Sequence, residues 1–127
     1  MSTILDITAR EIRVGVNVIV FPEGTRGDSY ALRPFKKGPF VLAAEAGVPI
    51  VPTIVHGTIE VLPRGSLYLR AGTVDIHFLE AVSTEGRTYE DRDALAREVW
   101  DRMADAFEEL YGIECRPPAL PAAANGD

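Results

Sequence analysis

The hydrophobic residues of this chain recur with two different periods, and together these predict helices alternating with short strands. Spacings of three and four residues predict amphipathic helices. A proline suits the first turn of the middle helix, and a glycine suits the end of each. The predicted helices cover residues 1–13, 40–46 and about 89–111, with Pro39 opening the second and Gly15, Gly47 and Gly112 ending the three.

The helix predicted at about 89–111 is the longest. Thr88 and Asp91 have the spacing of a capping box at its start. Its apolar residues form one stripe, which we expect to pack against a sheet rather than bind a ligand. The stripe comprises Leu95, Val99, Met103, Ala106 and Leu110, and Trp100 and Phe107 widen it.

Short apolar runs rich in β-branched residues predict strands at 16–21, 50–55 and 74–79, and a further short strand at 67–70. Prolines in the second run indicate a sheet edge, a strand end or a bulge. In the third run Val74, Ile76 and Phe78 alternate with three other residues, which predicts a half-buried strand. His77 falls on the other, polar face of that alternation.

The order of these elements favours one α/β domain, a partial mixed sheet with flanking helices. We expect this domain to cover residues 1–115. The tail at 116–127 is rich in proline and alanine and is predicted to be disordered.

Composition indicates the cellular compartment and excludes several kinds of site. No apolar run approaches the roughly 18–20 residues that cross a bilayer, and no signal-peptide pattern opens the chain. We therefore expect a cytoplasmic protein, either free or at the cytoplasmic face of a membrane. Cys115 is the single cysteine, which excludes an intrachain disulfide and a multi-cysteine metal site, so we expect no metal.

Charge is distributed unevenly along the chain. The net charge of −6 argues against general binding to nucleic acid or to anionic lipid. Between Pro22 and Arg70, however, six basic residues stand against four acidic ones. This basic middle indicates either a local anion-binding face or an ordinary solvated surface.

The polar turn after the first predicted strand carries the most distinctive chemistry. Glu23, Gly24, Thr25 and Arg26 follow Val18-Ile-Val-Phe-Pro22 directly. The carboxyl end of a strand is where open α/β sheets usually place ligands. Glycine permits close approach of a ligand, and a guanidinium suits a phosphate or carboxylate. Spacing alone leaves two interpretations open, an anion site and a simple turn.

The motif Phe21-Pro-Glu-Gly-Thr-Arg26 resembles a sequence block of the glycerolipid acyltransferases, the family of 1-acylglycerol-3-phosphate acyltransferases. Further segments resemble the same family in the same order, and together they span about residues 10 to 82. These segments are Leu32-Arg-Pro-Phe-Lys-Lys-Gly38, Leu42-Ala-Ala-Glu-Ala-Gly47, Val48-Pro-Ile-Val-Pro52 and Gly57-Thr-Ile-Glu-Val-Leu-Pro-Arg-Gly65.

The resemblance implies a fold like the carboxyl-terminal half of such an acyltransferase, and it implies roles for individual residues. Arg26 would bind the substrate phosphate with help from Lys36 or Lys37. Glu23 would hold Arg26 or accept a hydrogen bond from the substrate, and Gly24 and Thr25 would give close approach and donors. Pro22, Pro49 and Pro52 would shape the pocket wall. The co-substrate would be an acyl thioester of coenzyme A or of acyl carrier protein, with no bound cofactor.

The family's catalytic base, a histidine in a His-x-x-x-x-Asp block upstream of the Glu-Gly-Thr-Arg block, has no counterpart here. Residue 23 leaves no room for it, and neither His56 nor His77 is followed by aspartate five residues later. We therefore assign no catalytic residue to this chain. A late or truncated start, a fragment that pairs with another chain and a protein that has lost its catalytic pair all fit, and the first needs the fewest assumptions. A lost upstream half would leave apolar surface prone to self-association.

These observations favour the phosphate-binding half of an acyltransferase that acts on lysophosphatidate in phospholipid synthesis, with peripheral membrane contact. The alternative is a non-catalytic module that binds an anion or a lipid headgroup. A third interpretation is a purely structural α/β fragment.

Overall fold

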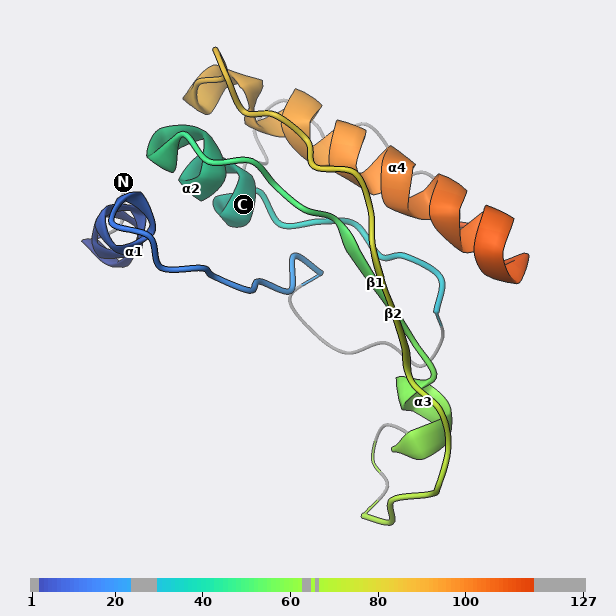
Figure 1. Cartoon of the computed structure of the whole chain (residues 1–127). Helices are drawn as coiled ribbons and strands as arrows, with labels where there is room; N and C mark the ends of the chain where they lie inside the picture. The colour runs from blue at the N-terminus through green and yellow to red at the C-terminus, as the bar shows by residue number, and fades with distance from the viewer. Residues whose placement is uncertain (1–2, 24–29, 63–64, 66, 116–127) are drawn as a thin grey trace.

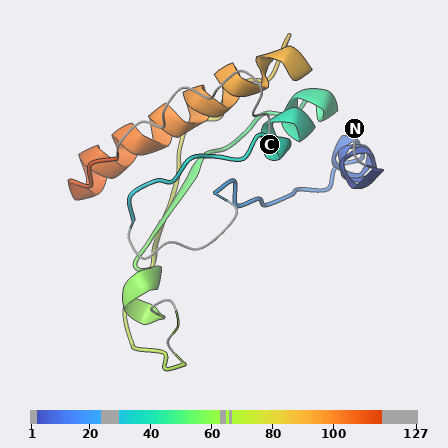
Figure 2. The same ribbon diagram turned by 180° about the vertical axis from the view of Figure 1, so that it is seen from behind.

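The computed structural model describes residues 3–23, 30–62, 65 and 67–115. Its elements are laid out in Figure 1 and, from behind, in Figure 2. The tail at 116–127, predicted to be disordered, lies outside the described residues. In chain order the elements are α1 (Thr3–Arg13), α2 (Gly38–Ala46), β1 (Thr53–His56), α3 (Thr58–Val61), β2 (Asp75–Phe78), the 3-10 turn η1 (Tyr89–Asp91) and α4 (Arg92–Tyr111).

The three helices expected from the sequence are present. Gly47 and Gly112 end α2 and α4 in left-handed conformations, and their N–H groups donate to carbonyls of the last turns. The capping box precedes α4, where the Thr88 N–H donates to Asp91 Oδ2 at 2.8 Å. The short helix α3 was not predicted. In the part of the chain that the structure describes, no helix is both long and apolar enough to cross a membrane.

The sheet is an antiparallel pair, with Ile54 opposite His77 and Val55 opposite Ile76. The predicted strand at 50–55 is interrupted because Pro52 has no N–H to donate. The Pro52 carbonyl still accepts a hydrogen bond from the Leu79 N–H at 2.9 Å. Before Pro52, Ile50 pairs with Val82 in an isolated β-bridge. The α/β class is confirmed.

The core lies between one face of this sheet and α4, with α2 beside them (Figure 1). Trp100 and Phe107 are buried, as expected from the stripe, whereas Leu110 is exposed. The buried cluster consists of Leu32, Phe35, Phe40, Ile54, Val82, Leu95, Ala96, Val99, Trp100 and Phe107.

The predicted burial of strand β2 is wrong. Ile76 and Phe78 are exposed, and His77, expected on the polar face, lies on the side facing α4. The register explains the reversal: Ile54, the residue opposite His77, is fully buried beneath α4, so the two share the covered face. The apolar side chains of β2 are left on the open face.

Two predicted strands do not form in the described structure. Residues 16–21 run as an extended segment, and residues 67–70 form an exposed loop. Neither pairs with a neighbouring strand among the described residues. An extended segment becomes a strand only when a second segment satisfies its N–H and C=O groups, and sequence pattern alone does not supply that partner.

Candidate functional site

The candidate anion-binding loop begins and ends at residues that are tied together. The Lys36 N–H donates to the Pro22 carbonyl at 2.7 Å, and the Arg33 N–H donates to Glu23 Oε2 at 2.8 Å. Gly24, Thr25 and Arg26 lie outside the described residues. The carboxylate of Glu23 thus closes the loop on the backbone of Arg33, a contact the sequence did not predict.

The returning half of this loop is anchored in the core. Leu32 and Phe35 are buried, the Trp100 indole N–H donates to the Arg33 carbonyl at 3.0 Å, and the Leu32 N–H lies 3.4 Å from Cys115 Sγ. With Leu32 and Phe35 turned inward, Arg33 and Lys36 are exposed. A fixed backbone therefore carries cations at the surface beside the start of the loop.

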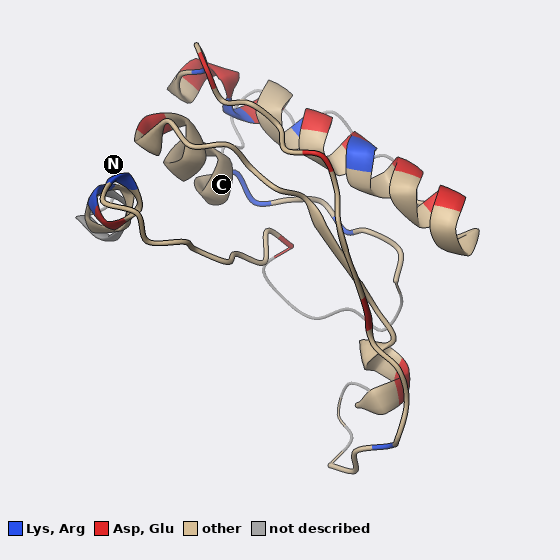
Figure 3. Cartoon of the chain, in the orientation of Figure 1, with Lys and Arg blue, Asp and Glu red and all other residues tan. Residues whose placement is uncertain are grey.

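The two lysines expected to assist phosphate binding differ in their surroundings. Lys36 is exposed, whereas the Lys37 ammonium lies 3.5 Å from the Asp93 carboxylate at the start of α4. Figure 3 shows basic residues on the 30–37 segment running beneath acidic residues of α4. Among the described residues Lys36 forms no ion pair, so a ligand would bind it without displacing a carboxylate. At Lys37 a ligand would compete with Asp93.

The hydroxyl of Tyr30, in the returning half of the loop, makes three hydrogen bonds. This hydroxyl donates to the Glu60 carboxylate and accepts from the N–H groups of Gly57, at 2.9 Å, and Ile59, at 3.1 Å. Partial burial and the hydrogen bond to Glu60 raise the pKa of Tyr30. The same hydrogen bond lowers the pKa of Glu60. Tyr30 thereby joins the loop to the β1–α3 turn.

Both histidines are held by aromatic contacts. His56 is stacked between Tyr30 and Tyr111, with ring centroids 4.3 and 3.7 Å away. His77 Nε2 lies 2.7 Å from the Tyr111 hydroxyl, which also lies 3.5 Å from Asp75 Oδ2. Burial and the nearby Asp75 raise the pKa of Tyr111. This arrangement holds the end of α4 against the sheet.

The prolines expected to shape the pocket wall differ in burial. Pro52 is buried and Pro22 is half-buried, whereas Pro49 is exposed. Pro49 lines a shallow hollow together with Gly47 and the 81–87 segment, and no described residue of the 22–37 loop lines that hollow. The pocket-shaping role of these prolines stays a prediction.

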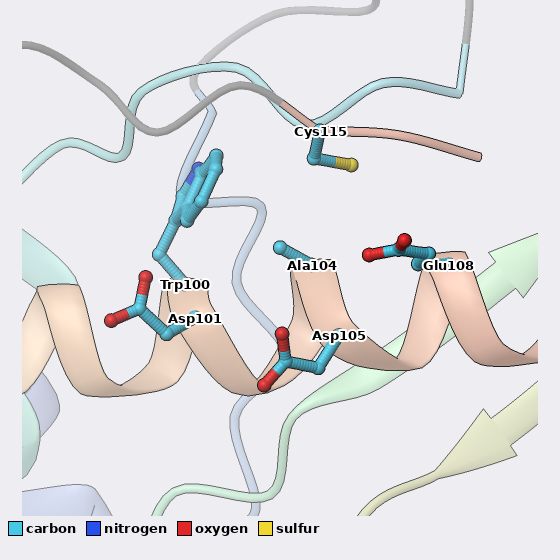
Figure 4. Close-up of a pocket in the computed structure, with 6 residues that line it drawn as sticks. All are labelled: Trp100, Asp101, Ala104, Asp105, Glu108 and Cys115. Carbon is cyan, nitrogen blue, oxygen red and sulfur yellow. The ribbon is translucent and has the colours of Figure 1, made fainter.

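A second hollow, of about 330 Å³, lies beside α4 (Figure 4). Asp101, Asp105 and Glu108 project from the helix along it, and Cys115 lies across from them. Three carboxylates repel a phosphate. The candidate anion site is therefore the 22–37 loop rather than this hollow.

Sequence reasoning missed the contribution of Tyr30 and left Arg33 out of the site. The signal for Arg33 was its place between Leu32 and Phe35, because two buried anchors turn the residue between them outward. Tyr30 had no local signal, since its partners lie about thirty residues later in the sequence.

Comparison with known proteins finds similarity to acyltransferases. The acyltransferase family model matches residues 1–56. The human 1-acyl-sn-glycerol-3-phosphate acyltransferase beta is 40% identical over 84% of this chain. The crystal structure of the 1-acyl-sn-glycerophosphate acyltransferase PlsC from Thermotoga maritima superposes with a TM-score of 0.76 over 91% of this chain, at 30% identity. The chain is therefore homologous to 1-acyl-sn-glycerol-3-phosphate acyltransferases over most of its own length.

The similarity covers most of this chain but only part of each relative. The chain spans 38% of the human protein and 47% of the Thermotoga maritima chain. The 1-acyl-sn-glycerol-3-phosphate acyltransferase of Saccharomyces cerevisiae, 36% identical over 83% of this chain, is covered over 36% of its length. This acyltransferase homologue therefore corresponds to less than half of the relatives with which it aligns.

Proposed function

We propose that this chain supplies the phosphate-binding part of an enzyme that transfers an acyl group from an acyl thioester to 1-acylglycerol-3-phosphate. The observation that carries the proposal is the closed 22–37 loop. The backbone N–H groups of Arg33 and Lys36 donate to the start of the loop, and buried anchors hold these two residues there. Relatives named for this acceptor share the chain's sequence over most of its length.

The chemistry divides into binding and proton transfer. Attack of the glycerol hydroxyl on a thioester carbonyl requires a base to remove the hydroxyl proton while the thiolate departs. Arg26, with Lys36, would hold the phosphate and fix the position of that hydroxyl. Neither His56 nor His77 is followed by aspartate five residues later, so we assign neither as the base.

A binding experiment tests the phosphate role separately from catalysis. We expect a short-chain, soluble lysophosphatidate to raise the Tm of the chain, because a ligand that binds only the folded state stabilises it. The monoacylglycerol with the same acyl chain, which lacks the phosphate, serves as the control ligand. An equal shift with both ligands would overturn the proposal.

Substitution of Arg26 tests the residue itself. Arg26→Ala is expected to abolish most of the lysophosphatidate-dependent shift, since it removes a bidentate phosphate donor. Arg102→Ala is the matched control, because it also removes one guanidinium, and Arg102 pairs with Glu98 within α4 at 3.4 Å. In the product of the complete reading frame, Arg26→Ala should raise the lysophosphatidate concentration needed for half-maximal acyl transfer. Separate assays with coenzyme A and acyl carrier protein thioesters would define the donor.

Neither histidine of this sequence is followed by aspartate five residues later, which favours a second candidate, a non-catalytic module that binds phosphate headgroups. If the product of the complete reading frame bound lysophosphatidate but transferred no acyl group, that result would support the second candidate. Acyl transfer by that product would exclude it.

A further inference from the structure

The loop between α3 and β2 projects away from the helical body of the molecule. In Figures 1 and 2 it forms the lower tip, at the opposite end of the hairpin from α1 and α2. Leu67, Tyr68 and Leu69 follow one another in this loop, with exposed fractions of 94%, 80% and 74%. All three are among the most exposed large hydrophobic residues of the described chain.

Three consecutive large apolar or amphipathic side chains on a projecting tip differ from scattered surface hydrophobics. Single exposed leucines are common on soluble proteins, but contiguous apolar patches mark interaction sites. Because the loop projects from the rest of the molecule (Figures 1 and 2), it suits a soft partner that it can enter better than a rigid surface that it must match. Tyrosine is also enriched where proteins meet the membrane interface, since its ring is apolar and its hydroxyl is polar.

The charge around the tip also favours a membrane surface as the partner. Between Glu60 and Asp75 the sequence contains two arginines, Arg64 and Arg70, and no acidic residue. Arg70 is exposed directly after Leu69. The flanking carboxylates are engaged elsewhere, Glu60 with Tyr30 and Asp75 near Tyr111.

The remaining negative charge is concentrated away from the tip. Figure 3 shows acidic residues spaced along α4, while the described part of the tip carries a basic residue only. A protein of net charge −6 therefore presents a locally basic, apolar end. That combination complements an anionic lipid surface, because basic side chains near such a surface contribute favourable electrostatics.

We propose that residues 67–70 form a membrane-docking tip, in which Leu67, Tyr68 and Leu69 enter the bilayer interface and Arg70 contacts lipid phosphates. The inference deepens the proposed function and rests on it for its purpose, since an enzyme whose acceptor is a lysolipid must collect that acceptor from a membrane. The physical argument for the tip itself comes from exposure, shape and charge. Its test therefore uses lipid without lysophosphatidate or an acyl donor.

Vesicle sedimentation gives the first measurement. The chain should bind vesicles of phosphatidylglycerol and phosphatidylcholine, and the double variant Leu67→Ser/Leu69→Ser should lose about tenfold or more of its partitioning, as expected for removing two buried leucines. Ile19→Ser is the matched control, because Ile19 is 84% exposed but lies in the 16–21 segment far from the tip. Arg70→Gln should weaken binding to these vesicles roughly fivefold and have little effect with pure phosphatidylcholine.

Fluorescence then locates the contact. Trp100 is the single tryptophan and is only 2% exposed, so the unmodified chain should resist quenching by lipids brominated on their acyl chains. Tyr68→Trp should add emission that those lipids quench. Tyr68→Trp emission that brominated vesicles leave unquenched would overturn the proposal, as would equal vesicle binding by Leu67→Ser/Leu69→Ser.

A second copy of the chain is the competing occupant of this tip. If Leu67→Ser/Leu69→Ser converted an oligomer to a monomer in light scattering and left vesicle binding unchanged, the tip would be a protein interface and the proposal would be wrong. Loss of vesicle binding at unchanged mass supports it. Because lysophosphatidate is absent from these assays, their outcome is independent of whether Arg26 binds phosphate.

Discussion

The two faces of the β1–β2 hairpin have opposite surroundings although both carry apolar residues. On one face Ile54 is fully buried beneath α4, within a cluster that includes Trp100 and Leu95. On the other face Phe78 is 75% exposed, and Val55 and Ile76 are exposed beside it. The hydrophobicity of a strand therefore did not decide which side was covered.

The comparison shows that a packing partner determines which apolar residues become core. Helix α4 supplies a long apolar stripe for one face, and its last turn supplies Tyr111 for the polar residues of β2. The segment 16–21 is rich in apolar residues and remains exposed, as does the open face of the sheet. Apolar sequence creates a tendency to be buried, and only a complementary surface satisfies it.

A substitution on the covered face of the sheet should have the largest effect on the free energy of unfolding. Trp100→Ala should destabilise the chain by about 3–5 kcal/mol, because it leaves a cavity and removes the hydrogen bond to the Arg33 carbonyl. Phe78→Ala, on the open face, should change the free energy of unfolding by only about 0.5 kcal/mol or less. Urea unfolding of the two variants measures both. Similar losses would show that the open face is covered in solution.

A glycine at the end of the hairpin gives the next largest effect. Gly57 has a φ of 111°, and a Cβ there would collide with the Thr73 carbonyl oxygen, so Gly57→Ala should cost about 3 kcal/mol or more. Gly86 is the control, since its φ is 75° but nothing beyond its chain neighbours lies within 4 Å of where a methyl group would stand. Gly86→Ala should cost about 1–2 kcal/mol from conformation alone. Equal Tm losses would contradict close packing of the hairpin end.

The smallest effect concerns the tie between the candidate loop and the hairpin. Hydrogen bonding from Tyr30 lowers the pKa of Glu60 below its ordinary value of 4.5. This contribution is present above pH 4.5 and is lost as the pH falls through the folded-state pKa, because the unfolded chain takes up the proton first. Wild type should therefore lose more stability than Glu60→Gln on acidification below pH 4.5.

The control for this acid measurement is Glu80→Gln, which removes one negative charge from the exposed residue Glu80 and leaves the Tyr30 contact intact. Its acid loss should follow that of wild type. If Glu60→Gln and wild type lost stability in parallel, the hydrogen bond from Tyr30 would contribute nothing to the folded state.

Local signals predicted much of the fold and part of the site. Stop glycines, the capping box at Thr88 and the helical stripe predicted α2 and α4 because their causes lie within a few residues of one another. The assignment of Lys36 and Lys37 as phosphate partners stays a prediction, as do the roles given to Glu23 and the prolines. The ion pair of Lys37 with Asp93 and the hydrogen bond of Glu23 to Arg33 could not be predicted, since no local rule chooses such partners.

The sequence by itself determined the α/β class, the long capped helix and the acyltransferase motif, because periodicity, capping and motif order are written in neighbouring residues. Only the tertiary structure decided that His77 faces α4, that Tyr30 ties the loop to Gly57, and that Ile76 and Phe78 remain on an open face. These outcomes depend on strand register and on contacts between residues far apart in the chain. Such contacts form only when the whole domain packs, so no single stretch of sequence specifies them.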